Sequence, residues 1–422
     1  MKIKLFDYQI EDRDWGIANP YSILALQMGL GKTGISLSIS EETKSQRVLC
    51  IVPAYLTLNW KNEINKFLDN KIITLFKSSK DVYYQVDSDF VVVSYDIAIK
   101  SECLFEWADM VICDEAQNIK SMKARRTQMI HKLVFESSVP RFHLLTGTPV
   151  KNRVEEYYSL ISLCYYNPKN KEDKFASTFE TAIDFADYFS FRKEIEKFIR
   201  NRRIKIVSWE GVREDKIPEL KKWLAPIYRS RKSMMLPPII KNVIVSDAED
   251  VELWKEYLKL EESDSVSVMP TQKKSAAVAK VPFTIEYVKD LLEEIGDSPV
   301  VIFTDHVESC KLIAEYFQVP AITGEMSVNN RQTLADEFQT GRWKILVATI
   351  GSFSTGYTLT KAWNMVFNDY NWTPGDNEQA IFRINRIGQT ETCIIHNILG
   401  SPQDQYIWET LQSKKEVIKK VT

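Results

Sequence analysis

The fold is decided by the stretch Met28-Gly29-Leu30-Gly31-Lys32-Thr33, which lies between an apolar run at 22–26 and an amphipathic run that begins at Ile35. A glycine-rich turn between a strand and a helix lets backbone N–H groups face an anion. In such loops the lysine reaches the terminal phosphates and the threonine hydroxyl ligates magnesium. The first glycine of the usual GxxxxGK(S/T) pattern is replaced by Leu26, so the match is partial. The stretch predicts a phosphate-binding loop, with a chance loop as the alternative.

Short β-branched runs alternate with amphipathic stretches on both sides of this loop. The first series lies at 22–26, 47–52, 90–94, 110–113 and 141–145, and the second at 300–304, 321–323, 345–348, 365–367 and 392–398. This rhythm is typical of parallel strands joined by helical crossovers. We therefore expect two tandem α/β parallel-sheet domains, at 1–232 and 233–422.

Two segments depart from this rhythm. The Lys/Arg/Glu-rich region at about 155–232 has helical spacing, which predicts a helical insertion and linker at the end of the first domain. A polar stretch at about 246–280 predicts an irregular insertion in the second domain.

Composition excludes several classes of protein. The 422 residues are 44% hydrophobic and 27% charged with a net charge of -2, which is typical of a globular protein without a general signal for nucleic acid. The apolar runs are far shorter than the roughly 20 residues of a membrane span. The charged stretch 1–14 is not a secretory signal, so we expect a cytoplasmic protein. The six cysteines form no CxxC pair, which argues against a zinc site or disulfides.

Two carboxylates follow the apolar run at 110–113. Asp114 and Glu115 come about 80 residues after the glycine-rich loop. At a strand end, Asp114 would face a metal and Glu115 a water that attacks the γ-phosphate. The alternative is a solvated acidic turn.

Together these stretches resemble the first three major motifs of superfamily-two helicases of the Swi/Snf-type branch. The motifs are Gly29 to Thr33, Asp114 to Lys120, and Leu145-Thr146-Gly147-Thr148-Pro149. The resemblance continues at 51–53, Asn59-Trp60, Ser94-Tyr95, 351–360, Trp372-Thr373-Pro374, Gln379-Ala380 and 386–389, and so covers nearly the whole chain. The stretches 276–289 and 389–414 look most like the annealing-helicase or HepA-related group, which remodels stalled forks. The resemblance implies two RecA-like lobes.

The resemblance also implies the residues of an ATP site. Lys32, Asp114, Glu115, Arg383 and Arg386 would be catalytic, and Thr33 and Asp114 would hold Mg²⁺. The residues that would bind ATP are Gln9, Gly29, Gly31, Lys32, Thr33, Gly356 and Gln379, with Gln9 reading the adenine. Thr146 and Thr148 match the motif thought to couple hydrolysis to movement, although they also suit a turn after a core strand.

The two arginines come from the second domain. Arg383 and Arg386 are three residues apart, so on a helix they would share a face and approach one triphosphate. ATP would then clamp the two domains together, as with an arginine finger. The alternative is a pair of surface arginines on an amphipathic helix.

Four positions depart from the family pattern. Phe382 replaces an acidic residue, Asn385 replaces a histidine, and Leu26-Gln27 replaces Asp-Glu. These departures affect partner contacts and coupling more than hydrolysis, because the catalytic side chains are retained.

A DNA path is implied by the resemblance and by local charge. The residues that match DNA-contacting loops are Pro53, Ser94, Lys151, Asn152, Thr304, His306, Ser354 and Thr355. The segment 192–232 has 14 Lys or Arg against 6 Asp or Glu, a balance of +8. Trp372 is either a wedge against DNA or a buried lobe-closing residue.

These patterns predict a monomeric, DNA-dependent ATPase that moves on duplex or branched DNA, with ATP and Mg²⁺ as cofactors. Fork remodelling, branch migration or limited unwinding follows from the subgroup resemblance. One alternative is an enzyme that strips a protein such as RNA polymerase from DNA, and another is a non-catalytic DNA clamp. An RNA helicase is disfavoured, because 372–374 and 386–389 resemble the duplex-DNA branch.

Overall fold

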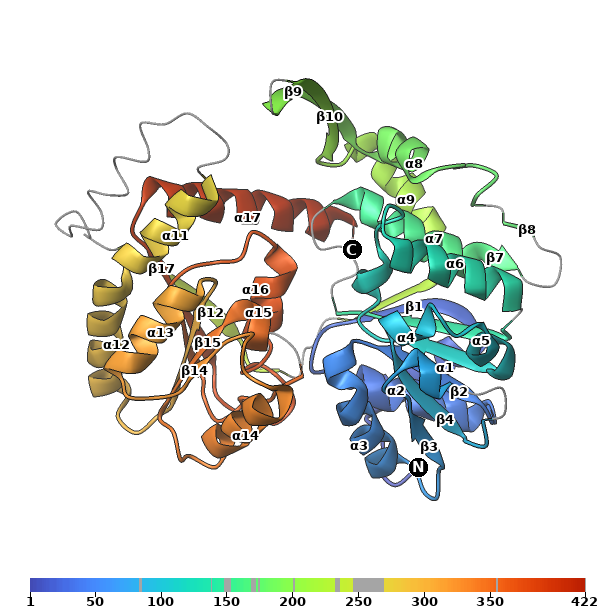
Figure 1. Ribbon diagram of the computed structural model, residues 1–422, viewed down its shortest axis with the longest axis horizontal. Coiled ribbons are helices and arrows are strands. Elements are labelled where there is room, and N and C mark those ends of the chain that lie inside the picture. Colours follow the sequence, from blue (N-terminus) through green and yellow to red (C-terminus); the bar gives the residue numbers. More distant parts are fainter. Residues whose placement is uncertain are drawn as a thin grey trace. The chain divides into compact units, whose positions relative to one another are not determined.

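The computed structural model describes the chain except residues 83–85, 138, 148–152, 168–171, 174, 200–201, 232–235, 246–268, 354–355 and 422, and it leaves out the side chains of 167, 172–173, 195–199, 202–206, 269–272, 353, 402–403 and 421. The chain divides into two compact units (Figure 1). Unit 1 comprises Met1–Ser233 with Glu416–Thr422, and unit 2 comprises Met234–Lys415. No described helix is long and apolar enough to cross a membrane.

Unit 1 is built on a parallel sheet with the strand order β11-β1-β6-β5-β2-β4-β3. Its strands are β1 (Tyr21–Leu26), β2 (Val48–Val52), β3 (Ile73–Leu75), β4 (Phe90–Ser94), β5 (Met110–Cys113), β6 (Arg141–Leu145) and β11 (Tyr228–Arg231). The five strands predicted in the first half of the sequence are therefore confirmed.

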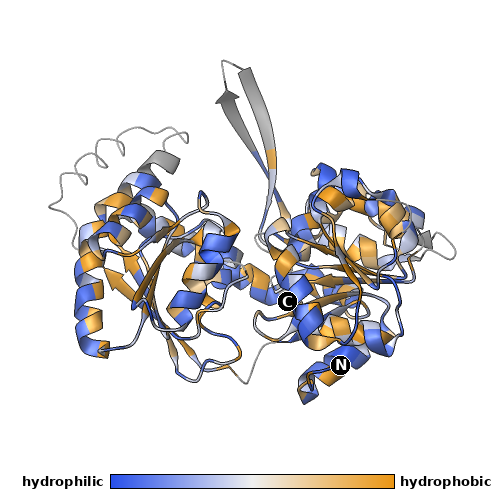
Figure 2. Cartoon of the chain, turned by 60° about the horizontal axis from the view of Figure 1, so that its bottom comes forward, coloured by the Kyte–Doolittle hydropathy of each residue, from blue (hydrophilic) through white to orange (hydrophobic). Residues whose placement is uncertain are grey.

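Helices cover both faces of this sheet. They are α1 (Asp7–Ala18), α2 (Lys32–Glu42), α3 (Thr57–Phe67), α4 (Tyr95–Ala98), α5 (Glu102–Trp107), α6 (Arg125–Ser137), α7 (Tyr157–Tyr165), α8 (Ala182–Phe189) and α9 (Ile217–Leu224). Alternate residues of β1 point to opposite faces: Ile23 packs with residues of α5 to α7, and Leu24 packs with residues of α2 and α3. A strand that is buried on both sides must be apolar throughout, which Figure 2 shows in the hydropathy of the central strands.

The insertion at 155–232 contains the expected helices α7, α8 and α9, together with a β-hairpin that sequence reasoning missed. Strands β9 (Phe191–Ile199) and β10 (Arg202–Glu210) pair antiparallel, with Phe191 opposite Glu210. The apolar residues Ile204 and Ile206 alternate with charged residues, which is the period of a strand. Two shorter strands, β7 (Tyr166–Asn167) and β8 (Glu172–Asp173), also pair antiparallel.

Unit 2 repeats the parallel architecture in the order β12-β17-β16-β13-β15-β14. Its strands are β12 (Ile239–Val245), β13 (Val300–Thr304), β14 (Ala321–Ile322), β15 (Ile345–Thr349), β16 (Asn364–Phe367) and β17 (Cys393–Leu399). Its helices are α11 (Met269–Ala279), α12 (Val281–Ile295), α13 (Val307–Tyr316), α14 (Val328–Gln339), α15 (Ile350–Phe353), α16 (Pro374–Ile381) and α17 (Pro402–Val421). The α/β fold class with two parallel sheets is confirmed.

The structure describes only the end of the polar insertion predicted at about 246–280. Residues 246–268 lie outside the described residues, and α11 occupies 269–279. The prediction of an irregular segment is wrong for α11, because the run from Lys273 to Ala279 contains three alanines and two lysines, which are good helix formers.

A buried ion pair anchors the end of α11 in unit 2. The Lys280 side chain is fully buried, and its Nζ lies 2.8 Å from Oδ1 of Asp404 and 3.2 Å from the carbonyl oxygen of Ile398. We predict that Asp404→Ala lowers the free energy of unfolding by about 3–5 kcal/mol, since it leaves an unpaired buried charge. The double variant Lys280→Met with Asp404→Leu should recover most of this loss. Urea denaturation of the three proteins measures both effects, and equal stability of Asp404→Ala and the unchanged chain would contradict the prediction.

Two buried histidines make unit 1 sensitive to acid. Burial lowers the pKa of His131 to about 4 and that of His143 to about 3. Because an unfolded histidine binds its proton near pH 6.5, the folded state loses stability as the pH falls below about 6.5. We predict a loss of roughly 2 kcal/mol for each histidine between pH 7.5 and 5. Denaturation at both pH values tests this, and His143→Gln should remove part of the pH dependence.

Candidate active site

The glycine-rich loop leads from β1 into the first turn of α2. Gly29 and Gly31 have φ values of 83° and 76°, in the left-handed region that favours glycine. A Cβ atom on Gly31 would come too close to Nε2 of Gln9, so a side chain at this position would require Gln9 to move. The loop therefore has the glycine backbone that is typical of a phosphate-binding turn.

Gln9 is attached to this loop. It lies on α1 with 6% of its surface exposed. Its amide donates to the carbonyl oxygen of Leu30 at 3.0 Å and accepts from the backbone N–H of Phe6 at 3.0 Å. The structure thus brings Gln9 to the loop, and its role in reading adenine stays a prediction.

Lys32 is the first residue of α2 and lies beside the ends of two strands. Its Nζ donates to the carbonyl oxygen of Leu26, at the end of β1, at 2.9 Å. A Cβ on Gly147, just after β6, would lie 3.4 Å from the same nitrogen. Thr33 follows in the first turn of α2 and is partly exposed. The cation and the hydroxyl therefore both lie at the carboxyl edge of the sheet, where parallel α/β sheets bind ligands.

Asp114 lies at the same edge, after β5, and is held by two hydrogen bonds to its carboxylate. The indole Nε1 of Trp60 donates to Oδ2 at 2.8 Å, and the backbone N–H of Glu115 donates to Oδ1 at 2.9 Å. Burial and the neighbouring Glu115 charge raise the pKa of Asp114 to about 6, against the opposing effects of Trp60 and Lys32. A buried carboxylate whose charge is disfavoured in this way is suited to a cation.

Glu115 has an uncommon backbone conformation and belongs to a short polar chain. Its φ of 51° is left-handed, a conformation that non-glycine residues adopt rarely and often at functional sites. Nε2 of Gln117 donates to the Glu115 carboxylate, and the hydroxyl of Thr146 donates to Oε1 of Gln117 at 2.8 Å. The chain links the proposed catalytic carboxylate to the end of β6. Thr148, predicted to act with Thr146, lies outside the described residues.

In unit 2 the two predicted arginines converge on one carbonyl oxygen. Arg383 and Arg386 each donate from Nη1 to the backbone oxygen of Tyr357, at 3.2 and 3.0 Å. Helix α16 ends at Ile381, so the prediction that both arginines share a helical face is wrong. They meet because the turns after α16 fold back against the residue that follows Gly356, whose φ is 87°.

Gln379 lies on α16 close to these arginines in sequence, with 2% of its surface exposed. Its backbone oxygen accepts from Nε of Arg383 at 3.0 Å. Among the described residues its Nε2 atom has no hydrogen-bond partner. Its proposed contact with nucleotide stays a prediction.

The structure describes some of the residues predicted to contact DNA and leaves others out. Pro53 follows β2, and the hydroxyl of Ser94 accepts from the backbone N–H of Ile97 as the N-cap of α4. Thr304 is fully buried, with its hydroxyl donating to the carbonyl oxygen of His306 at 2.9 Å. Lys151, Asn152, Ser354 and Thr355 lie outside the described residues. Contact of these residues with DNA stays a prediction.

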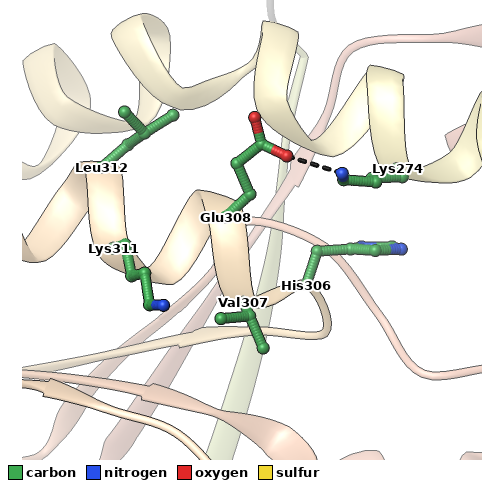
Figure 3. Close-up of a pocket in the computed structure, with 6 residues that line it drawn as sticks. All are labelled: Lys274, His306, Val307, Glu308, Lys311 and Leu312. Atoms are coloured by element: carbon green, nitrogen blue, oxygen red, sulfur yellow. Dashed lines mark ion pairs between the residues drawn. The ribbon is translucent and has the colours of Figure 1, made fainter.

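His306 lines a hollow of about 430 Å³ at the start of α13 (Figure 3). Lys274 on α11 pairs across it with Glu308 at 2.7 Å. His306 also lies with Asp305 and Asp369 in a group of three metal-type ligands. Their carboxylates are already engaged, since Lys273 binds Asp305 and Nδ1 of His306 lies 2.7 Å from Oδ2 of Asp369.

The charges around Asp369 favour an ion-pair network over a metal site. Burial would raise the pKa of Asp369, yet His306 and Lys280 bring it below its ordinary value. Trp372 packs partly buried against the same region, with the Lys273 ammonium 5.8 Å from its ring centroid. These contacts place Trp372 at a packed position of unit 2, with part of its surface exposed.

Sequence reasoning gave no role to Trp60, Tyr95, Gln117 or Lys273. Trp60 and Tyr95 contact Asp114 from positions 54 and 19 residues away in the sequence. Their signal was the stretches Asn59-Trp60 and Ser94-Tyr95, which follow two strands of the same sheet. Lys273 carried no signal, because α11 was not predicted.

A glycine-rich loop with its lysine and an Asp-Glu pair, together at the carboxyl edge of a parallel sheet, define the class of nucleoside triphosphatases with a phosphate-binding loop. Within this class the chain belongs to the SNF2-related domain family. Residues 13–288 match the SNF2-related domain, and residues 284–388 match the helicase conserved C-terminal domain.

Several known proteins are similar to this chain. The uncharacterized ATP-dependent helicase MG018 of Mycoplasma genitalium is 26% identical over 97% of this chain and 40% of its own length. The DNA annealing helicase and endonuclease ZRANB3 of Mus musculus is 26% identical over 94% of this chain and 38% of its own length. The chain thus spans about two fifths of these relatives. The solved Sulfolobus solfataricus SWI2/SNF2 ATPase core in complex with dsDNA aligns with 100% of this chain and 97% of its own, at 22% identity and a TM-score of 0.47.

Proposed function

We propose that unit 1 binds ATP with Mg²⁺ at the carboxyl edge of its sheet. The loop from Gly29 to Gly31 would surround the phosphates, Lys32 would contact their charge, and Gln9 would contact the adenine. Thr33 and Asp114 would hold Mg²⁺, which supplies charge neutralisation on the phosphates. The left-handed glycines of the loop and the oxygen atoms of Thr33 and Asp114 fit such a ligand.

Glu115 is proposed to orient the attacking water and accept its proton. Its carboxylate is held by Gln117, which is itself held by the buried Thr146. A carboxylate fixed in this way needs little reorganisation when the reaction begins. Gln117 and Thr146 connect Glu115 to the end of β6, so a movement of that strand end would shift the Glu115 carboxylate.

Arg383 and Arg386 are proposed to complete the reaction from unit 2. Lys32 of unit 1 would contact the phosphates of ATP. The family resemblance implies that the two arginines of unit 2 act on the phosphate that is transferred. Hydrolysis would then require both units to engage one ATP. Gly356 and Gln379 would take part from the same side, since the carbonyl of Tyr357, next to Gly356, accepts from both arginines.

The function that this arrangement supports best is ATP-dependent movement on duplex or branched DNA. The observation that supports the proposal is that the residues proposed to be catalytic lie in two separate parallel-sheet units, Lys32, Asp114 and Glu115 in the first and Arg383 and Arg386 in the second. A cycle of engagement and release by two units can move a bound polymer. Both relatives named above are called helicases, and one is an annealing helicase, which favours fork remodelling or branch migration as the outcome.

Strand movement tests this proposal directly. The full chain is mixed with a labelled replication fork or a mobile four-way junction, and the strand products are separated after incubation with ATP. We expect products that appear only with ATP and that disappear in Glu115→Gln. Hydrolysis that DNA stimulates without any strand movement would contradict the proposal and favour removal of bound proteins from DNA.

A further inference from the structure

Two segments of unit 1 run from proposed DNA contacts directly to Asp114. The first follows β2: the backbone N–H of Asp114 donates to the carbonyl oxygen of Ile51 at 2.9 Å, and Pro53 comes two residues later. The chain then enters α3, where Trp60 is 1% exposed and donates to Oδ2 of Asp114 at 2.8 Å. One short segment thus joins Pro53 to the carboxylate proposed to hold Mg²⁺.

The second segment follows β4. Ser94 is the last residue of that strand, and the next residue, Tyr95, is 2% exposed. The phenol of Tyr95 donates to the backbone carbonyl of Asp114 at 2.8 Å. The ring also lies 5.7 Å from the Arg126 guanidinium, which pairs with Asp96 at 2.8 Å. A shift of the backbone at Ser94 would therefore move the donor that holds the turn at Asp114.

These two donors hold Asp114 at different places. Trp60 holds the carboxylate and Tyr95 holds the backbone, while the N–H of Glu115 holds the second carboxylate oxygen at 2.9 Å. Both aromatic side chains are buried, so water does not readily replace a donor that is removed or displaced. The position of the carboxylate consequently depends on where the segments after β2 and β4 lie.

We propose that Trp60 and Tyr95 are positioning residues through which DNA at Pro53 and Ser94 fixes Asp114, so that DNA binding raises the rate of ATP hydrolysis. The inference rests on the proposed function, because it requires DNA at the first pair of residues and ATP with Mg²⁺ at Asp114. It adds a physical connection between the two sites that lies within unit 1.

The test compares Trp60→Phe and Tyr95→Phe with the unchanged chain. Each substitution removes one hydrogen-bond donor and keeps an aromatic ring. The measured quantities are kcat for ATP with and without saturating duplex DNA, the DNA concentration that gives half stimulation, and the Mg²⁺ concentration that gives half the maximal rate. We expect the ratio of kcat with DNA to kcat without DNA to fall about tenfold in each variant, the cost of one lost buried hydrogen bond. The half-saturating Mg²⁺ concentration should rise, and the DNA concentration for half stimulation should stay the same.

Two matched variants control for the loss of an indole or phenol hydrogen bond elsewhere in unit 1. The indole of Trp107 donates to the carbonyl oxygen of Val86 at 3.1 Å, and the phenol of Tyr158 donates to that of Glu180 at 3.1 Å. Trp107→Phe and Tyr158→Phe should leave the stimulation ratio unchanged.

Three results would overturn the inference. If DNA stimulates the unchanged chain and both test variants equally, the donors do not transmit DNA binding. If kcat falls by the same factor with and without DNA, the donors only maintain the site. If only one variant loses stimulation, the other residue has no such role. A chain that DNA does not stimulate at all would instead refute the proposed function itself.

Discussion

Glu115→Gln should lower kcat for ATP hydrolysis at least about 100-fold, the range expected for loss of a general base. An amide has nearly the size of a carboxylate and can still bond to Gln117, but it cannot accept a proton from water. ATP should still bind, because the loop and Lys32 are unchanged. Phosphate release measures kcat, and titration with a fluorescent ATP analogue measures binding.

The matched control for this variant is Glu102→Gln. Glu102 lies exposed in the first turn of α5 and is not among the residues proposed to bind ATP. The Glu102→Gln variant should hydrolyse ATP at the rate of the unchanged chain. If Glu115→Gln retained its activity, another group would have to activate the water, and the catalytic role of Glu115 would be wrong.

Arg386→Ala should lower kcat by about 1,000-fold, the lower end of the range for an arginine that stabilises the phosphoryl transition state. ATP affinity should change much less, since the phosphate-binding loop belongs to unit 1. Arg386→Lys should restore little activity, because a lysine lacks the planar fork that binds two phosphate oxygens. The same two measurements of phosphate release and analogue binding separate these effects.

Arg342→Ala is the control for the arginine. Arg342 is an exposed arginine of unit 2 that pairs with Glu337. The Arg342→Ala substitution should leave kcat for ATP hydrolysis unchanged. Thermal unfolding of both variants shows whether Arg386→Ala also loosens the turn at Tyr357, to which Arg386 donates. Full activity in a folded Arg386→Ala protein would contradict the division of the catalytic set between the units.

Most strands of both sheets could be predicted from sequence, because strands buried on two faces must be apolar throughout. The 110–113 run is an example, since Val111 and Ile112 pack on opposite faces of the sheet of unit 1. The phosphate-binding loop could also be predicted, because glycine, lysine and threonine at this spacing are typical of loops that bind phosphate and magnesium. The hairpin β9–β10 could have been found from the alternation of Ile204 and Ile206, which the high charge of the segment obscured.

Long-range contacts could not be predicted. The Trp60 indole reaches Asp114 only because β2 and β5 are neighbours in the sheet. The meeting of Arg383 and Arg386 depends on the backbone oxygen of Tyr357, and no residue type signals the position of a backbone oxygen.

The role of small polar residues at strand ends is difficult to assign from sequence. Ser94 and Thr304 were expected to contact DNA, yet each hydroxyl forms a local hydrogen bond, to the N–H of Ile97 and to the oxygen of His306. Ser and Thr commonly bond to nearby backbone, so their presence at a loop does not separate a cap from a contact surface. Any DNA contact at these positions would use the neighbouring backbone or require the local bond to open.

The most direct test is steady-state ATP hydrolysis by the full chain with no nucleic acid, single-stranded DNA, duplex DNA, a fork, a four-way junction and RNA. Glu115→Gln is measured in parallel. A DNA-driven motor predicts a rate that rises strongly with the fork or junction, rises little with RNA, and is lost in Glu115→Gln. The same low rate with every nucleic acid, unaffected by the substitution, would contradict it.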